Sequence, residues 1–240
     1  MGKEHLWRET AVGMINLFIS CEGYTEEVFI KRLMAKELAY LGVNLIPVIV
    51  MTSKSKSGVV RRGGCSSYDK IKRDVLNLCR RPGSYVTTMY DFYKFPAIPG
   101  FTVSYDLASP LERVTEMEAA FSEDIDRENF HANIQLHEFE TLLFSDPSAF
   151  SVCGMSKKQV KKLADVRRDF LPEEIDGGEM TAPSKRILRV NPGYQKPTDG
   201  LTVAREIGLD TMCRECPHFG KWVSWIKTLP KTAKQTSNGR

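Results

Sequence analysis

The sequence predicts an α/β fold, with a central and mostly parallel sheet flanked by helices and a helical elaboration near the C-terminus. In the first half, short apolar or β-branched runs alternate with helical patterns, in the order strand, helix, strand, helix, strand. This alternation is typical of parallel strands joined by right-handed crossovers. The residues beyond Pro147 have helical patterns and long loops. We therefore expect an α/β core over 1–150, a helical elaboration of the same domain over 151–230 and a basic flexible tail over 231–240.

The first strand and helix have the clearest signals. A short apolar run, Met14–Cys21 (MINLFISC), predicts a buried strand that stops at a glycine turn. From Thr25 to Tyr40 apolar residues recur at helical spacing, and the first turn is capped and acidic. Glu26 lies in that first turn, where the helix dipole stabilises a carboxylate. We assign Glu26 to the start of the helix.

The remaining core elements follow in alternation along the chain. β-branched and aromatic runs predict the strands, and helical spacing with turn residues predicts the helices and their ends. The segment between the second strand and the next helix is rich in Ser, Gly and basic residues, which predicts a flexible cationic loop. These elements are a strand over Leu45–Met51, the loop over Thr52–Ser66, a helix over Ser67–Cys79, a strand over Tyr85–Tyr90, a helix over Pro110–Asp126 and a strand over Ala132–Leu136.

Composition places the chain among ordinary globular proteins, since 42% of its 240 residues are hydrophobic and 27% are charged. No apolar run approaches the roughly 20 residues that cross a bilayer. The stretch Met1–Thr10 is charged, unlike a signal peptide. The six cysteines lack the dense spacing of disulfide-stapled secreted domains, and we read them as reduced thiols. We expect a soluble cytoplasmic protein with no membrane partner.

Basic residues are clustered although the formal net charge is only +4. Such clusters bind phosphates in some proteins and form solvated helix faces in others, and both interpretations stay open here. The clusters are Lys54/Lys56/Arg61/Arg62, Lys157/Lys158/Lys161/Lys162 with Arg167/Arg168, and Lys185/Arg186/Arg189.

Acidic residues directly follow three of the expected strands. Glu22 follows the first, Asp91 the third, and Glu138 and Glu140 come after the fourth. Ligands of open parallel sheets gather at the carboxyl ends of the strands. Carboxylates that converge there need protons or a cation to coexist, and Mg²⁺ or Mn²⁺ takes oxygen ligands while keeping water positions for a phosphate. The pattern indicates a Mg²⁺ or Mn²⁺ site, although each acid alone could also cap a helix or face solvent.

Five segments carry a family resemblance. They are CEGYTE (Cys21–Glu26), TTMYDFY (Thr87–Tyr93), QLHEFE (Gln135–Glu140), APSKRI (Ala182–Ile187) and CPHF (Cys216–Phe219). Together they resemble a bacterial family known as domain of unknown function 4276, over about Ile15 to Ile226. That family is similar to the TOPRIM-like proteins found beside ATPases in bacterial anti-phage systems.

The resemblance implies a TOPRIM-like fold and metal-dependent phosphodiester chemistry. Glu22 takes the place of the single glutamate after the first strand, which acts as general acid or base or helps to hold metal. Asp91 takes the first place of a paired-aspartate motif, whereas Tyr93 stands where the second aspartate is usual. Glu140 resembles an acid that related families carry downstream, and Glu138 is the next candidate. The implied catalytic residues are Glu22, Asp91 and Glu140, and the implied metal ligands are Glu22, Asp91, Glu138 and Glu140.

Candidate contacts to phosphate or nucleic acid come from basic residues. Arg61 and Arg62 precede a Gly-Gly pair that lets a backbone approach a phosphate. Lys185, Arg186 and His218 lie in segments of the family resemblance, and the Lys185/Arg186 pair could equally be an ordinary surface pair.

Aromatic residues crowd the loop after Asp91, where they could stack on unpaired bases or pack in the core. They are Tyr90, Phe92, Tyr93, Phe95 and Phe101.

We predict a metal-dependent nuclease that acts on DNA or RNA as an anti-phage effector, with an ATPase as a possible partner. The alternative is a non-catalytic TOPRIM-like module that binds nucleic acid or a partner protein, because Tyr93 departs from the metal-binding pattern. A small-molecule phosphotransferase ranks last, since the chain has no GxxxxGK[ST] nucleotide-binding motif.

Overall fold

A computed structural model of the chain describes residues 14–54, 60–62, 67–102, 109–175, 178 and 181–237. The side chains at 51–54, 60–62 and 230–237 lie outside this description.

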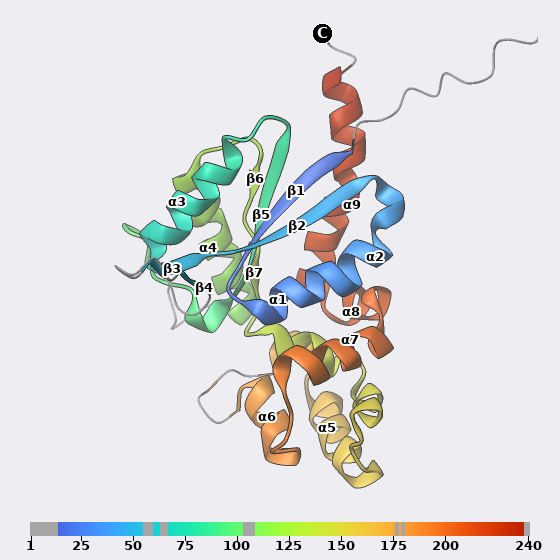
Figure 1. The fold of residues 1–240 in the computed structure, drawn as a ribbon. Helices are drawn as coiled ribbons and strands as arrows, with labels where there is room; N and C mark the ends of the chain where they lie inside the picture. The colour runs from blue at the N-terminus through green and yellow to red at the C-terminus, as the bar shows by residue number, and fades with distance from the viewer. Residues whose placement is uncertain are drawn as a thin grey trace, which may run out of the picture.

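The described core is a parallel sheet, as the alternating pattern predicts (Figure 1). Its strands run in the order β2-β1-β5-β6, and β7 extends the pairing along β5. Every pairing in this sheet is parallel, which confirms the α/β fold. The strands are β1 (Ile15–Cys21), β2 (Val43–Ile49), β5 (Ser84–Asp91), β6 (Phe130–His131) and β7 (Ile134–Gln135).

Helices cover both faces of the sheet because its strands are apolar on both sides. Successive residues of a strand point to opposite faces. Leu17 and Ile19 of β1 therefore join one core cluster, while Phe18 joins the other. Helices α3 (Tyr68–Cys79) and α4 (Pro110–Ile125) pack on the Phe18 side.

The opposite face is covered by elements from both ends of the chain. The predicted helix after β1 is present as α1 (Tyr24–Phe29), a π-helical turn (Ile30–Met34), α2 (Ala35–Glu37) and a 3₁₀ turn (Ala39–Leu41). The long helix α9 (Pro217–Ser237) returns to this face, where the Trp222 indole N–H donates to Thr87 Oγ1 of β5 at 3.0 Å. The C-terminal region is thus part of the main core.

The C-terminal region is helical, as predicted, and its helices are mostly short. Its elements are 3₁₀ helices at Phe139–Ser145, Pro147–Cys153 and Pro172–Glu174, a π-helical turn at Lys196–Gly200, and the helices α5 (Lys157–Asp169), α6 (Pro183–Val190), α7 (Leu201–Ile207), α8 (Leu209–Glu215) and α9. The backbone of α9 continues to Ser237, past the start of the predicted tail at Lys231.

Two details differ from the sequence prediction. The predicted loop over Thr52–Ser66 contains a short antiparallel pair, β3 (Met51–Lys54) with β4 (Val60–Arg62). The predicted fourth strand is split into β6 and β7. Between them, the Asn133 N–H donates to Thr88 Oγ1 at 3.0 Å, and that hydroxyl donates to the Asn133 carbonyl at 2.7 Å. The Thr88 side chain therefore takes over bonds that a regular strand makes through its backbone.

Among the described residues, no helix has the length and apolar character needed to span a bilayer. The five described cysteines are free thiols.

Candidate functional site

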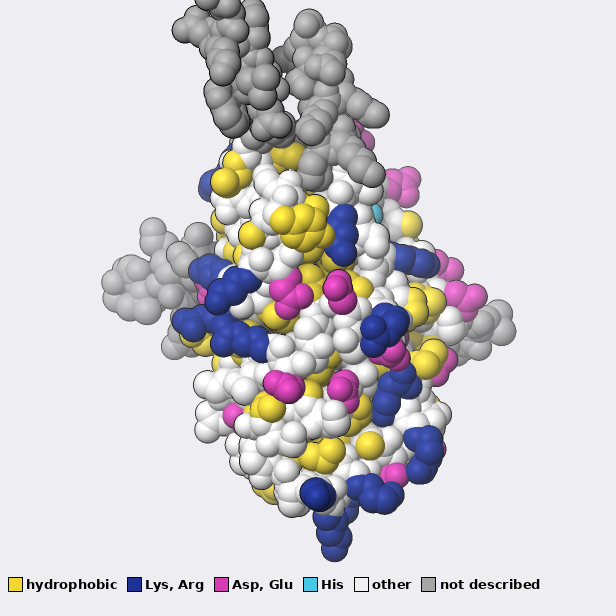
Figure 2. All heavy atoms as spheres, turned by 90° about the vertical axis from the view of Figure 1, so that its right-hand side faces the viewer, with side chains coloured by type: hydrophobic (Ala, Val, Ile, Leu, Met, Phe, Trp, Pro, Cys, Tyr) yellow, Lys and Arg dark blue, Asp and Glu magenta, His cyan; other side chains and the backbone are white. Residues whose placement is uncertain are grey.

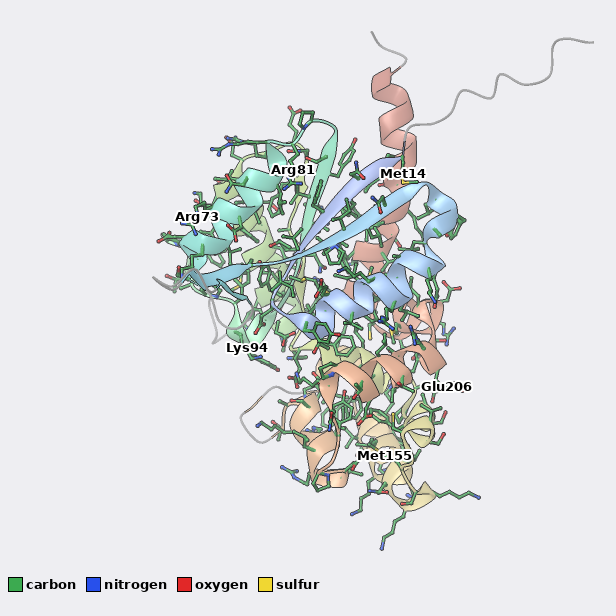
Figure 3. All side chains as sticks on the ribbon, in the orientation of Figure 1. Met14, Arg73, Arg81, Lys94, Met155 and Glu206 are labelled. Atoms are coloured by element: carbon green, nitrogen blue, oxygen red, sulfur yellow. The ribbon has the colours of Figure 1, made fainter. Side chains whose placement is uncertain are left out.

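Five carboxylates lie around the carboxyl ends of β1, β5 and β7, and we call them the acid cluster. Glu22 directly follows β1, and Asp91 ends β5. Lys94, which contacts both of these acids, lies at the end of the sheet opposite Met14, the residue before β1 (Figure 3). The members are Glu22, Glu26, Asp91, Glu138 and Glu140.

Asp91 is the buried centre of the acid cluster, with only 4% of its surface exposed. Its Oδ1 accepts the backbone N–H of Phe139 at 3.1 Å. Lys94 Nζ lies 3.7 Å from Asp91 Oδ2 and 3.4 Å from Glu22 Oε1. Burial raises the pKa of Asp91 well above its usual range, and the charge of Glu26 adds to the effect. The charges of Glu22 and Glu140 act on Asp91 in the same direction.

Glu26 has two roles. Its Oε2 accepts the backbone N–H of Gly23 at 2.9 Å, so the predicted role at the helix start is confirmed. The side chain is also buried, and burial together with the charge of Glu22 raises its pKa. The sequence shows the capping role of Glu26. It does not show that Glu26 lies close to Asp91, because that depends on how the strands pair.

Glu138 and Glu140 are held by groups from the C-terminal region. Lys196 Nζ lies 2.6 Å from Glu140 Oε2 and 3.3 Å from Glu138 Oε2. Glu138 also accepts the Ser184 backbone N–H at 2.6 Å and the Ser184 hydroxyl at 3.0 Å, at the start of α6. Burial raises the pKa of the fully buried Glu140 to about 7, against the opposing charge of Lys196. No local sequence pattern marks Lys196 as a partner of these acids.

The acid cluster divides into two parts with respect to a metal ion. Mg²⁺ is usually bound through one or two carboxylates, several waters and substrate phosphates. Glu22, Glu26 and Asp91 fit such a site, because only Lys94 pairs directly with members of this group among the described residues. The charge of Lys196 also acts on Glu26 and Asp91, but its ammonium pairs with Glu138 and Glu140. Glu138 and Glu140 fit it less well, since Lys196 and Ser184 already contact them. Within the described part of the chain, no three His, Cys, Asp or Glu side chains form a ready-made metal site.

Tyr93, two positions after Asp91, lies against His137. The two rings stack with centroids 5.2 Å apart, and the Tyr93 hydroxyl hydrogen-bonds to His137 Nδ1. His137 Nε2 lies 2.9 Å from the Glu173 carbonyl oxygen, which can only accept. The Nε2 therefore carries a proton, and in the neutral imidazole Nδ1 accepts from Tyr93. His137 has a φ of 64°, a left-handed conformation that is unusual for a non-glycine residue.

The predicted phosphate contacts lie on three separate elements, β4, α6 and α9. Arg61 and Arg62 belong to β4 by their backbone, and their side chains lie outside the described residues. Lys185 is exposed on α6. Arg186 Nε donates to the Thr181 carbonyl at 2.7 Å, and its guanidinium lies 5.9 Å from the Phe170 ring. Arg186 therefore packs locally.

Three residues of the basic cluster on α5 pair with acidic side chains. Lys161 and Arg168 both pair with Asp165 at 2.9 Å, and Arg167 pairs with Glu215 at 2.7 Å. Figure 2 shows Lys and Arg side chains at the lower end of the molecule, where α5 lies in Figure 1. These contacts favour a solvated helix face over a phosphate site.

His218 lies in the interior, where it contacts Glu118 and Glu173. Its Nε2 is 3.0 Å from Glu118 Oε1, and its backbone N–H donates to Glu173 Oε2 at 3.0 Å. Glu173 also accepts the next backbone N–H of α9, so its carboxylate caps this helix. His218 and Glu173 thus help to fix the start of α9.

Replacing His218 with glutamine is expected to destabilise the fold more at low pH than at high pH. Burial lowers the pKa of His218, but the hydrogen bond and charge of Glu118, with the charge of Glu173, outweigh burial and raise it. Because the pKa of His218 is higher in the folded than in the unfolded protein, its protonation stabilises the fold. This stabilisation is fully present below the pKa of the unfolded state, about 6.5, and is lost as the pH rises through the pKa of the folded state.

The measurement is the difference in Tm between wild type and His218→Gln from pH 5.5 to 9. His131 is the matched control because burial lowers its pKa, so the difference for His131→Gln should shrink at low pH. If the difference in Tm between wild type and His218→Gln does not change with pH, a charged pair of His218 with Glu118 is contradicted.

The chain matches a known family over residues 21–227, which include the whole acid cluster, Lys94 and Lys196. The family is described as a domain of unknown function, DUF4276. The chain belongs to this family. No curated protein and no solved structure matches the chain. The description of DUF4276 names no activity, so function has to be argued from the acid cluster.

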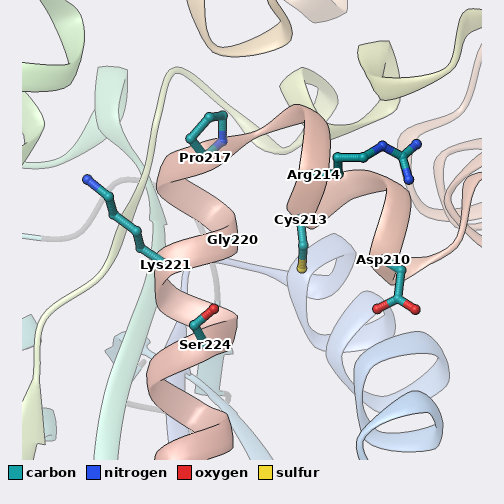
Figure 4. Close-up of a pocket in the computed structure, with 7 residues that line it drawn as sticks. All are labelled: Asp210, Cys213, Arg214, Pro217, Gly220, Lys221 and Ser224. Carbon is teal, nitrogen blue, oxygen red and sulfur yellow. The ribbon is translucent and has the colours of Figure 1, made fainter.

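This DUF4276 chain also has an open groove between α8 and α9 (Figure 4). No member of the acid cluster lines it. The two helices approach closely at Gly220, where an added Cβ would lie 2.4 Å from the Cys213 carbonyl oxygen. The lining residues are Asp210, Cys213, Arg214, Pro217, Gly220, Lys221 and Ser224.

Proposed function

We propose that this DUF4276 protein is a TOPRIM-like nuclease of the bacterial cytoplasm that uses Mg²⁺ or Mn²⁺ to hydrolyse phosphodiester bonds. One observation supports this most strongly. Glu22, Glu26 and Asp91 gather at the carboxyl edge of a parallel sheet, where burial raises the pKa of Glu26 and of Asp91 although the charge of Lys196 opposes the shift. A divalent cation supplies the missing positive charge.

The residues of this edge have distinct proposed roles. Asp91 and Glu26 are buried and supply negative charge for the cation. Glu22 has a more accessible side chain and takes the proton of the attacking water as general base. Lys94 lies at the solvent-exposed edge, where its ammonium pairs with a substrate phosphate oxygen. A bound Mg²⁺ would orient the water and stabilise charge on the phosphate oxygens.

The biological setting follows from the family resemblance. TOPRIM-like proteins found beside ATPases in anti-phage systems suggest an effector of defence that an ATPase partner restrains. An adjacent ATPase gene would support this setting, and its consistent absence among relatives would count against it.

Cleavage by the purified protein tests the proposal. End-labelled single-stranded DNA, duplex DNA and transfer RNA are incubated with Mg²⁺, with Mn²⁺ or with EDTA. We expect products only with a metal and none from an Asp91→Asn variant. Products that form equally in EDTA would overturn the metal-dependent mechanism.

A second candidate is a non-catalytic module that binds nucleic acid or a partner protein. It is favoured by the lysine contacts, since Lys94 and Lys196 already pair with four of the five carboxylates. Tyr93 at the usual aspartate place favours it as well. This candidate predicts binding without cleavage under any of the metal conditions.

Magnesium is expected to raise the Tm of the wild type but not that of Asp91→Asn. A ligand that binds only the folded state stabilises it by about 2.7 kcal/mol at 100 times its Kd. For a chain of this size that is roughly 5–11 °C. The quantity compared is the rise in Tm that Mg²⁺ causes in each protein, because the substitution removes a buried charge and so changes the Tm without Mg²⁺ as well. NaCl at matched ionic strength is the control, and equal increments in both proteins would place the ion elsewhere.

A further inference from the structure

We infer that the acid cluster acts on single-stranded nucleic acid and that Tyr24 and Tyr93 provide the surfaces on which its unpaired bases stack. The inference rests on the proposed function and names the substrate class of the same site. It starts from the exposure of the aromatic residues near Asp91.

Core packing accounts for most of the aromatic residues after β5. Tyr90, Phe92 and Phe95 are buried, and Phe101 packs against the same core cluster. Tyr93 differs, with 41% of its surface exposed. It lies between Asp91 and Lys94, next to the candidate metal site. Of the two alternatives for this aromatic loop, packing explains its neighbours and leaves Tyr93 as the base-stacking candidate.

Contacts with neighbouring rings hold the Tyr93 ring in place. His137 stacks on it at a centroid distance of 5.2 Å, and the Tyr93 hydroxyl is bonded to His137 Nδ1. His137 is fixed in turn by the Glu173 carbonyl. A ring whose orientation is already set loses little entropy when a base stacks on it. Tyr93 is therefore a preorganised platform.

Tyr24 provides a second exposed ring on the same edge. It is the first residue of α1, two positions after Glu22, and 62% of its surface is exposed. The 3.4 Å contact between Lys94 and Glu22 joins its segment to the segment that carries Tyr93. The two tyrosines thus belong to two segments that meet at the candidate metal site.

The difference in depth between acids and tyrosines favours an unpaired strand. Asp91 and Glu140 are 4% and 0% exposed, so they lie deeper than Tyr93 and Tyr24, which are 41% and 62% exposed. In a duplex, neighbouring base pairs cover the faces of each base, whereas an unpaired strand can turn its bases onto aromatic side chains. The side chain of Lys94, the residue after Tyr93, is 53% exposed. Its ammonium can pair with the backbone phosphates of the bound strand. Such binding depends little on base sequence.

Fluorescence anisotropy with labelled oligonucleotides tests the inference in metal-free buffer at one fixed salt concentration. The probes are oligo-dT, oligo-rU and a DNA duplex of the same length. We expect tighter binding of one or both single strands than of the duplex. Tyr24→Ala and Tyr93→Ala are each expected to weaken single-strand binding about five- to 150-fold.

Tyr40→Ala is the matched control. Tyr40 is 73% exposed but lies near Gly42, whose carbonyl pairs with Ile15 at the opposite end of β1. Its loss should leave binding unchanged. Tyr24→Trp, which keeps an exposed ring, should bind at least as tightly as wild type. Circular dichroism and Tm verify the fold of each variant, and Tyr24→Ala tests the inference even if Tyr93→Ala fails to fold.

The outcomes separate this inference from the proposed function. Binding of duplex as tight as that of single strands, or wild-type binding by Tyr24→Ala, would overturn the inference even if metal-dependent cleavage is observed. Preferential single-strand binding that Tyr24→Ala weakens would support the inference even if no cleavage occurs, and would then favour the non-catalytic module.

Discussion

A Glu22→Gln variant is expected to cleave nucleic acid about 100- to 10,000-fold more slowly than wild type, because it removes a general base at unchanged size. The fold should persist. The ion pair of Glu22 with Lys94 has a partly exposed partner and a separation of 3.4 Å, and such pairs contribute little to stability. Initial rates with one substrate and one metal, together with Tm, measure both effects.

Glu27→Gln is the control for this experiment. Glu27 lies in the same first turn of α1, but its carboxylate pairs with Lys31 at 2.6 Å rather than with the acid cluster. Its cleavage rate should equal that of wild type. If Glu22→Gln cleaves at the wild-type rate, the catalytic centre is not the one proposed.

A Gly220→Ala variant is expected to lose roughly 1–3 kcal/mol of unfolding free energy, the usual cost of overpacking. The added Cβ would lie 2.4 Å from the Cys213 carbonyl oxygen and 3.2 Å from its carbon (Figure 4). These are backbone atoms, so no side-chain rotation relieves the clash and α8 has to move away from α9. The corresponding fall in Tm is about 2–12 °C.

Ser224→Ala controls for the groove itself, since Ser224 lines the same groove one turn further along α9 and is exposed. Its effect should stay within about 0.5 kcal/mol. Urea unfolding of both variants gives the comparison. A Gly220→Ala protein as stable as wild type would show that α8 and α9 lie further apart in solution.

The sequence predicts the sheet well because the signals of its strands are local. The run Met14–Cys21 and the run Tyr85–Tyr90 correspond closely to β1 and β5. The split between β6 and β7 was not predictable, since it depends on bonds between Thr88 and Asn133, 45 positions apart. The β3–β4 pair was missed because its short strands are rich in Ser, Lys and Arg, which resemble a loop.

The candidate site was predictable where position along a strand decides it. Glu22 and Asp91 directly follow or end strands, so the parallel topology brings them to one edge. Lys196 and Ser184 reach Glu138 from distant helical turns, and no spacing in the chain indicates such contacts. The fixed position of the Tyr93 ring likewise depends on His137, 44 positions away.

The contact of Lys196 with Glu140 also bears on how the protein matures during synthesis. Chains emerge from the ribosome N-terminus first, and early segments begin to fold before later ones exist. The strands β1, β2 and β5 can pair once residue 91 is free, but Glu140 lacks its ammonium partner until Lys196 has emerged. A carboxylate is costly to bury without such a partner unless it is protonated. The edge that carries the acid cluster is therefore completed late, and a nascent or truncated chain that stops before residue 196 lacks both the partner of Glu140 and α9, which covers one face of the sheet.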